Sequence, residues 1–357
     1  MIGPNAPEVD RTARFPQASV DALAAAGLLG AVSAVEVGGV GLGLAGAARV
    51  VERIARECGA TAMVVCMHFS GTAVIEAHGD DATRRAAAAG AHLSTLAFSE
   101  AGSRSHFWAP LSTAKADGDG FVLDAQKSWV TSARQATAYV WSSQATSGEG
   151  SSIWLVPRDA AGLSVPGPFD GLGLRGNDSA PVTAAGVRLG ASARLGADGG
   201  GTDVMMGIVL PIFTACNAAC SVGLMEGAFG RVAAHVISTK HQHLGTSLAD
   251  LPTIRAYVAR MKIRTDQARA LWEDTLSALT TGRPDAMLRV LEVKASAGEA
   301  ALEVLATGMR VCGGAAFRKE VGVERMFRDG QAASVMAPTS DQLYDFIGRA
   351  VLGMPLF

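Results

Sequence analysis

The segment DGDGFVLDAQKSWVTSA, residues 117–133, separates two kinds of sequence pattern in this chain. An Asp-Gly turn leads into a run of alternating apolar and polar residues, which predicts one arm of a β-hairpin. Two further β-rich runs follow at 137–146 and 151–159, with no helical pattern between them. Short strands without intervening helices predict a small barrel or sandwich rather than an alternating βαβ sheet.

Apolar residues at helical spacing flank this β-rich region on both sides. We therefore expect an α+β fold with an N-terminal helical domain over residues 1–95, a β-barrel domain over 96–198 and a C-terminal four-helix bundle over 199–357. Two long amphipathic segments, 251–282 and 285–314, supply much of the bundle, because long apolar stripes are buried most easily against one another.

Composition and charge exclude several classes of function. The chain has 357 residues, of which 49% are hydrophobic and 18% charged, so a large folded core is expected. Lys and Arg number 31 against 33 Asp and Glu, and this balance gives no support for a nucleic-acid partner. Residues 204–225 carry no charge, but Pro211 and Asn217 interrupt them, so we expect a buried helix rather than a membrane span.

The cysteines and the N-terminus indicate a cytoplasmic protein. Five cysteines without a CxxC pair fit a reducing compartment better than a disulfide framework. The first residues lack the basic start and apolar run of a secretory signal. We expect no metal site, since His241 and His243 have no Cys or acidic companion at ligand spacing.

A glycine triplet, Gly41, Gly43 and Gly46, has the G-x-G-x-x-G spacing and precedes a helical segment. Such a triplet can hold dinucleotide phosphates at a helix N-terminus when it follows a buried strand. No clear strand precedes it here, and no parallel strand follows. The sequence therefore argues against a nicotinamide-nucleotide fold.

Five short motifs together resemble the acyl-CoA dehydrogenase family, in the family's order and over nearly the whole chain. They are GGVGLG at 38–43, LAFSEAGSRSH at 96–106, KSWVTSA at 127–133, VCGGAAF at 311–317 and MFRDG at 326–330. The resemblance implies an FAD flavoprotein that acts on an acyl thioester, carried by CoA or a carrier protein, or on a related small molecule. It also implies a homodimer or homotetramer with FAD at a subunit interface, and an electron-transfer or flavin-reductase partner.

The matched positions supply candidate FAD contacts. Trp129 offers a flat surface for the isoalloxazine ring and Thr131 a hydroxyl, while main-chain groups near Phe98 and Ser99 suit its polar edge. Outside this motif Trp129 would equally suit a barrel core. The glycine turn after residue 312 would approach the FAD of a neighbouring subunit. The full expected set is Leu96, Phe98, Ser99, Ser105, Trp129, Thr131, Arg310, Gly313, Gly314 and Thr339.

The carboxylate base of the family is missing from both places where relatives carry it. The family's Y-E-G-T segment matches Met336-Ala337-Pro338-Thr339, which puts Ala337 at the base position. Relatives that carry the base on the first bundle helix match Phe213. A base is needed because the α-proton of a thioester is only weakly acidic.

Three alternatives follow from the missing base. The chain is a diverged dehydrogenase or oxidase with another base, a reduced-flavin-dependent monooxygenase of the same fold, or an inactive subunit of a heteromeric dehydrogenase. His106 stands where the family has Asp, and it is the candidate catalytic residue. A histidine there could accept a proton or donate to oxygen bound at the flavin.

Overall fold

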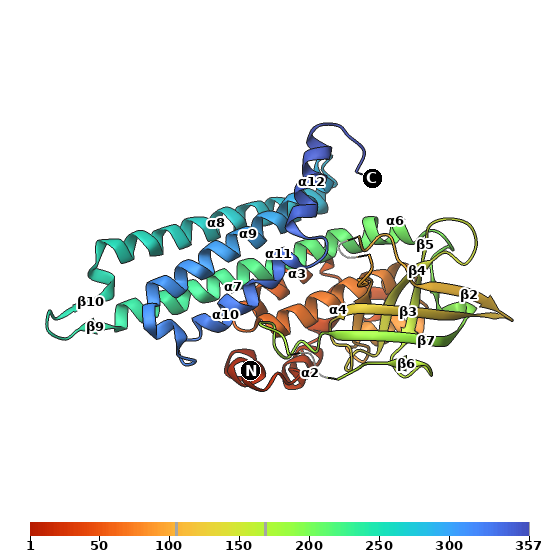
Figure 1. Ribbon diagram of the computed structural model, residues 1–357, viewed down its shortest axis with the longest axis horizontal. Helices are drawn as coiled ribbons and strands as arrows, with labels where there is room; N and C mark the ends of the chain where they lie inside the picture. Colours follow the sequence, from red (N-terminus) through yellow and green to blue (C-terminus); the bar gives the residue numbers. More distant parts are fainter. Residues whose placement is uncertain (104–105, 168–169, 357) are drawn as a thin grey trace.

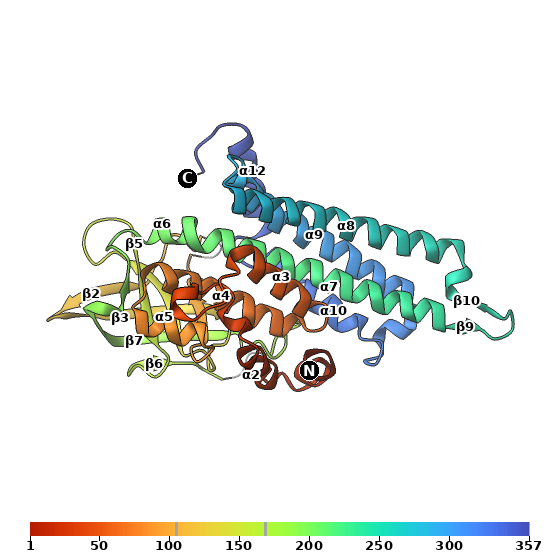
Figure 2. The same ribbon diagram turned by 180° about the vertical axis from the view of Figure 1, so that it is seen from behind.

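The computed structural model describes residues 1–103, 106–167 and 170–356 (Figure 1). Helices come first, strands follow, and long helices complete the chain, which confirms the predicted α+β architecture. The two sheets lie at one end of the long axis, and a small β9–β10 hairpin lies at the other (Figures 1 and 2).

The N-terminal region consists of five helices. They are α1 (Ile2–Thr12), α2 (Gln17–Ala25), α3 (Gly43–Ala55), α4 (Gly59–His78) and α5 (Asp81–Ala88). Gly43 begins α3, but the element before it is the 3-10 turn η2 (Val35–Val37) rather than a strand. The glycine triplet therefore lacks the βαβ frame of a dinucleotide site, as the sequence suggests.

The middle region contains two four-stranded sheets. The first has the order β1 (Ser94–Ala97), β4 (Ala138–Gln144), β5 (Ser151–Pro157) and β8 (Arg194–Leu195). The second has the order β2 (Thr113–Asp117), β3 (Gly120–Val130), β7 (Ala180–Gly190) and β6 (Leu163–Ser164). Strands β2 and β3 pair antiparallel across the predicted Asp-Gly turn, with Asp117 opposite Gly120. Side chains of both sheets, including Leu123, Trp141 and Trp154, share one core.

Three long helices form the axis of the C-terminal bundle. They are α7 (Leu210–Ser238), α8 (Pro252–Thr281) and α9 (Ala286–Cys312), and shorter α10 (Val323–Gly330), α11 (Ala332–Val335) and α12 (Ser340–Val351) follow. α6 (Gly201–Val204) and a π-helical turn (Met205–Val209) lead into α7, while β9 (Lys240–His241) and β10 (Thr246–Ser247) connect α7 to α8.

Two glycines of α7 allow α3 to pack directly on its backbone. A Cβ atom at Gly223 would lie 2.3 Å from Glu52 O, and one at Gly227 would lie 2.2 Å from Arg56 O. Any larger residue at these positions would therefore force the two helices apart.

Three helical stretches, Gly59–His78, Gly201–Ser238 and Ala286–Phe317, are long and apolar enough to cross a membrane. The most apolar 18-residue part of Gly201–Ser238 is 94% buried inside the chain. The expectation of a buried helix at 204–225 is therefore confirmed.

Candidate active site

Apart from Thr339, and from Ser105, which lies outside the described residues, the expected FAD contacts form two groups that lie apart in one chain. Leu96 is in β1, Phe98 and Ser99 follow it, and Trp129 and Thr131 lie at the end of β3. Arg310, Gly313 and Gly314 lie at the end of α9. The Arg310 guanidinium sits 4.8 Å from the ring centre of Tyr257, in the first turns of α8 beside the β9–β10 hairpin. Figure 1 shows that hairpin at the end of the molecule opposite the sheets.

A buried ion pair anchors the group in the β domain. Lys127 Nζ lies 2.6 Å from Glu100 Oε1 and also donates to Ser142 O at 2.8 Å. Burial lowers the pKa of Lys127 to about 8, although the Glu100 carboxylate opposes this shift. Burial acts to raise the pKa of Glu100, but Lys127 and the Ser112 hydroxyl outweigh it, so the pKa is lowered. The pair fixes β3 against the segment that leaves β1.

Trp129 is turned out of the β core. Its side chain is 58% exposed, whereas Lys127, two residues earlier, is buried. Neighbouring residues i and i+2 of a regular strand share a face, but the pairing of β3 with β7 is shifted between Lys127 and Val130. Such an irregularity re-aims side chains. The core-residue interpretation of Trp129 is therefore wrong, because most of its side chain lies outside the β core.

The other β-domain candidates are partly or fully buried. Leu96 and Phe98 have buried side chains, so only their main chain can reach a ligand. The carbonyl of Ser99 already accepts from Ser128 N at 2.9 Å. Thr131 is 2% exposed, and its hydroxyl lies 3.3 Å from Ser179 Oγ.

The loop that carries His106 packs against α12 through aromatic side chains. His106 Nδ1 donates to Ser103 O at 3.2 Å, which leaves Nε2 of the neutral ring as an acceptor. Its ring meets Trp108 edge-on at 5.1 Å, and Trp108 in turn contacts Phe346 of α12 at 5.2 Å. Thr339 caps α12 by accepting from Gln342 N at 3.3 Å. Ser105, another expected FAD contact, lies outside the described residues.

A buried lysine holds the segment that contains Ala337. Lys294 of α9 is 1% exposed and donates to Ala333 O, Met336 O and Pro338 O at 2.8, 3.0 and 2.8 Å. An ammonium group has three donors, so this set saturates it. Burial lowers the pKa of Lys294 to about 7. The sequence reasoning missed this residue, although a lone lysine in the apolar stripe of α9 is a detectable signal.

Helix α7 faces the same segment. Phe213 and Thr214 are buried, and the Thr214 hydroxyl donates to Leu210 O at 2.8 Å. One turn later, Asn217 Nδ2 lies 3.4 Å from Met336 Sδ. The sequence analysis considers Asn217 only as an interruption of an apolar run, and it does not predict the contact with Met336.

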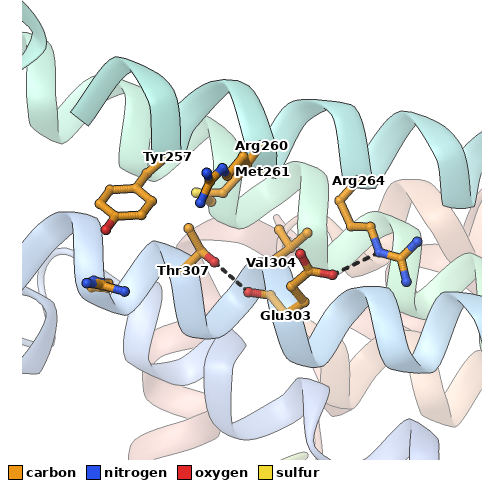
Figure 3. A pocket seen from close by; sticks show the side chains of 8 residues that line it. Tyr257, Arg260, Met261, Arg264, Glu303, Val304 and Thr307 are labelled. Atoms are coloured by element: carbon orange, nitrogen blue, oxygen red, sulfur yellow. Dashed lines mark hydrogen bonds and ion pairs between the residues drawn. The ribbon is translucent and has the colours of Figure 1, made fainter. Parts of the chain in front are cut away.

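Arg310 of the second group lines a positively charged pocket of about 140 Å³ between α8 and α9 (Figure 3). Arg260, Arg264 and Arg310 line it, and among the described residues only Arg264 has a carboxylate partner there, Glu303 at 3.0 Å. Gly313, which ends α9, has φ +56°, a conformation that favours glycine. The pocket therefore suits an anionic group.

The Arg328-Asp329 motif has a structural role. Arg328 Nη2 lies 2.6 Å from Asp10 Oδ2 of α1, and Asp329 Oδ1 accepts from Leu174 N at 2.6 Å. Burial raises the pKa of Asp329 to about 6. These contacts join α10 to the N-terminal helix and to the loop before β7.

No metal-binding cluster occurs among the described residues. No group of three or more His, Cys, Asp or Glu side chains in this part of the chain could hold an ion. The rings of His241 and His243 lie 6.1 Å apart. All five cysteines are buried and free.

Comparisons with known proteins agree with this architecture. The models for the N-terminal, middle and C-terminal domains of acyl-CoA dehydrogenase match residues 1–90, 95–187 and 199–352. Cyclohex-1-ene-1-carbonyl-CoA dehydrogenase of Geobacter metallireducens is 27% identical over 360 residues, covering 98% of this chain and 94% of that protein. A glutaryl-coenzyme A dehydrogenase in complex with glutaryl-CoA superposes with a TM-score of 0.93 at 24% identity, covering 99% and 92% of the two chains. PigA with FAD and proline superposes with a TM-score of 0.90 at 18% identity, covering 98% of this chain and 92% of that chain.

Proposed function

This chain belongs to the acyl-CoA dehydrogenase family, and from that premise we propose that it is an FAD-dependent oxidoreductase for an acyl thioester that works without the family's carboxylate base. The observation that carries the proposal is Trp129, an indole held outside the core beside the buried Thr131. Two relatives of the same fold are described with glutaryl-CoA and with FAD, which supports both ligand classes.

The residues present fit FAD. FAD would supply a two-electron acceptor next to the substrate. Trp129 would cover the flat face of the ring, and the Lys127–Glu100 pair would keep β3 in place. The Lys294 contacts would hold Thr339 at the start of α12.

The separation of the two candidate groups supports an oligomer. Arg310, Gly313 and Gly314 are exposed at the end of α9. Arg310 contacts Tyr257 in the first turns of α8, beside the β9–β10 hairpin, and that hairpin lies at the end of the molecule opposite the sheets (Figure 1). We therefore place the end of α9 against the FAD of a neighbouring subunit in a homodimer or homotetramer. The arginine-lined pocket would receive the charged part of that cofactor.

Proton transfer must come from a group other than Ala337 or Phe213, since neither side chain accepts a proton. His106 is exposed, and its Nε2 is available as an acceptor, so we assign it as the proton-transfer residue. The five buried, free cysteines support our assignment of the protein to the reducing cytoplasm.

The absence of a carboxylate at both positions also favours a second candidate, a reduced-flavin-dependent monooxygenase, because that chemistry needs no α-proton base. An inactive subunit of a heteromeric dehydrogenase is the third. Electron-transfer flavoprotein would serve the dehydrogenase, and a flavin reductase would serve the monooxygenase.

An anaerobic titration of the FAD-reconstituted protein distinguishes these functions. Loss of flavin absorbance on addition of acyl thioesters supports the dehydrogenase. Loss of flavin absorbance only on addition of an external reductant, followed by oxygenation of the substrate when oxygen is admitted, supports the monooxygenase. Turnover that appears only with a base-bearing partner supports the inactive subunit. Failure of the protein to bind FAD would overturn the proposal.

A further inference from the structure

Asn217 is a buried polar side chain without an adequate partner. It lies in the uncharged part of α7 and is 1% exposed. Its Nδ2 meets only the Met336 thioether, a weak acceptor, at 3.4 Å. Within the described part of the chain, no donor reaches its Oδ1 atom. Reversing the amide would set Oδ1 against the Met336 thioether, which has no hydrogen to donate, so the amide oxygen lacks a donor in either orientation.

An unpaired amide at this depth is costly, because it has lost its hydrogen bonds to water. Apolar residues surround it in α7, and Val or Leu would fill the position without that cost. Such a group therefore points to a ligand that completes its hydrogen bonds.

The position of Asn217 connects it to the reaction. It follows Phe213 by four residues and thus lies on the same face of α7. It also contacts Met336, the neighbour of Ala337. The amide therefore lies one helical turn from Phe213 and against the neighbour of Ala337, the two positions matched to the family's base, and we infer that it faces the acyl part of a bound thioester.

The chemistry of the site selects the ligand group. The unpaired Oδ1 atom requires a donor, which a methylene chain or a carboxylate does not have. The nearby amino group of Lys294 is already surrounded by three main-chain carbonyls, so it is not available to a carboxylate. A hydroxyl group donates to Oδ1 and accepts from Nδ2 at the same time.

We propose that Asn217 is a specificity-determining residue that recognises a hydroxyl on the acyl part of the substrate, so that the preferred ligand is a hydroxyacyl thioester. This inference rests on the proposed function. The Met336 side chain is flexible enough to swing away from the amide when the hydroxyl binds.

The test compares pantetheine thioesters of hexanoate, 3-hydroxyhexanoate and 4-hydroxyhexanoate, since pantetheine is common to CoA and carrier proteins. Dissociation constants are measured from the change in flavin absorbance. Wild-type protein should bind one hydroxy thioester about 3- to 10-fold more tightly than the unsubstituted one, as expected for one neutral hydrogen-bonding group. Asn217→Val should bring that ratio close to one, and Asn217→Ser provides a second, smaller replacement.

Thr265→Val is the matched control. It removes a buried hydroxyl that is already bonded to Met261 O at 2.8 Å on α8, so the preference should persist. Equal affinity of FAD-loaded wild-type protein for all three thioesters would overturn the inference and leave the proposed function intact. A preference that survives in Asn217→Val would also overturn it. A protein that does not bind FAD would overturn both.

Discussion

Lys127 Nζ and Glu100 Oε1 lie 2.6 Å apart, and both side chains are almost completely buried. The carboxylate also accepts from the main-chain N–H groups of Leu111 and Ser112. Lys127 belongs to β3, which carries Trp129, while Glu100 follows Phe98 and Ser99. One ion pair therefore sets the spacing between the two segments expected to hold the flavin ring.

Replacing Lys127 with Met should lower the free energy of unfolding by about 3–5 kcal/mol, because Glu100 would remain buried without its partner. Chemical denaturation of the two proteins measures the difference. Lys115→Met, an exposed lysine on the adjacent strand β2, is the control and should change stability by less than about 0.5 kcal/mol. Equal stability of the Lys127 and Lys115 variants would contradict a structural role for the pair.

Trp129→Ala should weaken FAD binding while leaving the stability of the FAD-free protein nearly unchanged. The indole is 58% exposed, so its removal creates little cavity in the core. Loss of aromatic stacking corresponds to an affinity about 3- to 10-fold lower. Trp129→Phe should retain part of the affinity. Unaltered FAD affinity in the alanine variant, measured by calorimetry, would rule out stacking on this residue.

Mixing two variants tests whether FAD lies between subunits. Trp129→Ala and Arg310→Ala should each weaken FAD binding when the variant is pure. In a mixed oligomer, one site combines the intact Trp129 of one subunit with the intact Arg310 of its neighbour. Dissociating and reassembling an equal mixture should therefore restore tight binding to a fraction of the sites. No recovery, in a mixture shown by mass spectrometry to contain hybrids, would exclude a shared site.

Lys294 should make stability depend on pH in a defined direction. Its pKa is about 7 in the folded chain, against an ordinary value of 10.5. Between these values the unfolded chain holds a proton that the folded chain lacks, so stability rises with pH through this group. The stability of wild type relative to Lys294→Met should therefore increase from pH 7 towards pH 10 and stay constant below pH 7. A difference that is flat over this range would show that Lys294 titrates normally.

The K-S-W-V-T segment illustrates what the sequence could and could not predict. Alternation and the Asp-Gly turn correctly identify the hairpin of β2 and β3. They do not reveal the outward orientation of Trp129, because that depends on the register shift between β3 and β7, a partner about 50 residues away. Local sequence patterns identify a strand, whereas the pairing of that strand with its neighbours decides on which face each side chain lies.

Lys294 and Asn217 escaped the sequence reasoning for a related reason. Each is a buried polar residue in a long helix, and neither belongs to a motif. Their partners are carbonyls and a thioether between Ala333 and Pro338, which come together only when α7, α9 and the start of α12 pack. By contrast, the prediction that Ala337 occupies the family's base position needs only the order and spacing of motifs along the chain.

Ala337 leads to the most decisive prediction about activity. An alanine methyl cannot accept a proton, and the phenyl ring of Phe213 cannot either. Loss of a general base usually lowers a rate by about a hundred- to ten-thousand-fold. We therefore expect negligible α,β-dehydrogenation of butyryl-CoA or octanoyl-CoA by the unmodified chain, measured with an artificial electron acceptor.

Ala337→Glu, combined with Pro338→Gly to relax the segment, should introduce measurable dehydrogenation that increases with pH as the new carboxyl ionises. Ala337→Gln with the same Pro338→Gly change matches the new side chain in size but cannot act as a base, so it should remain inactive. Robust turnover of either ester by wild-type protein would contradict this prediction and mean that His106, the proton-transfer residue assigned above, or another residue serves as the base even for these unactivated esters; His106→Ala would distinguish the two.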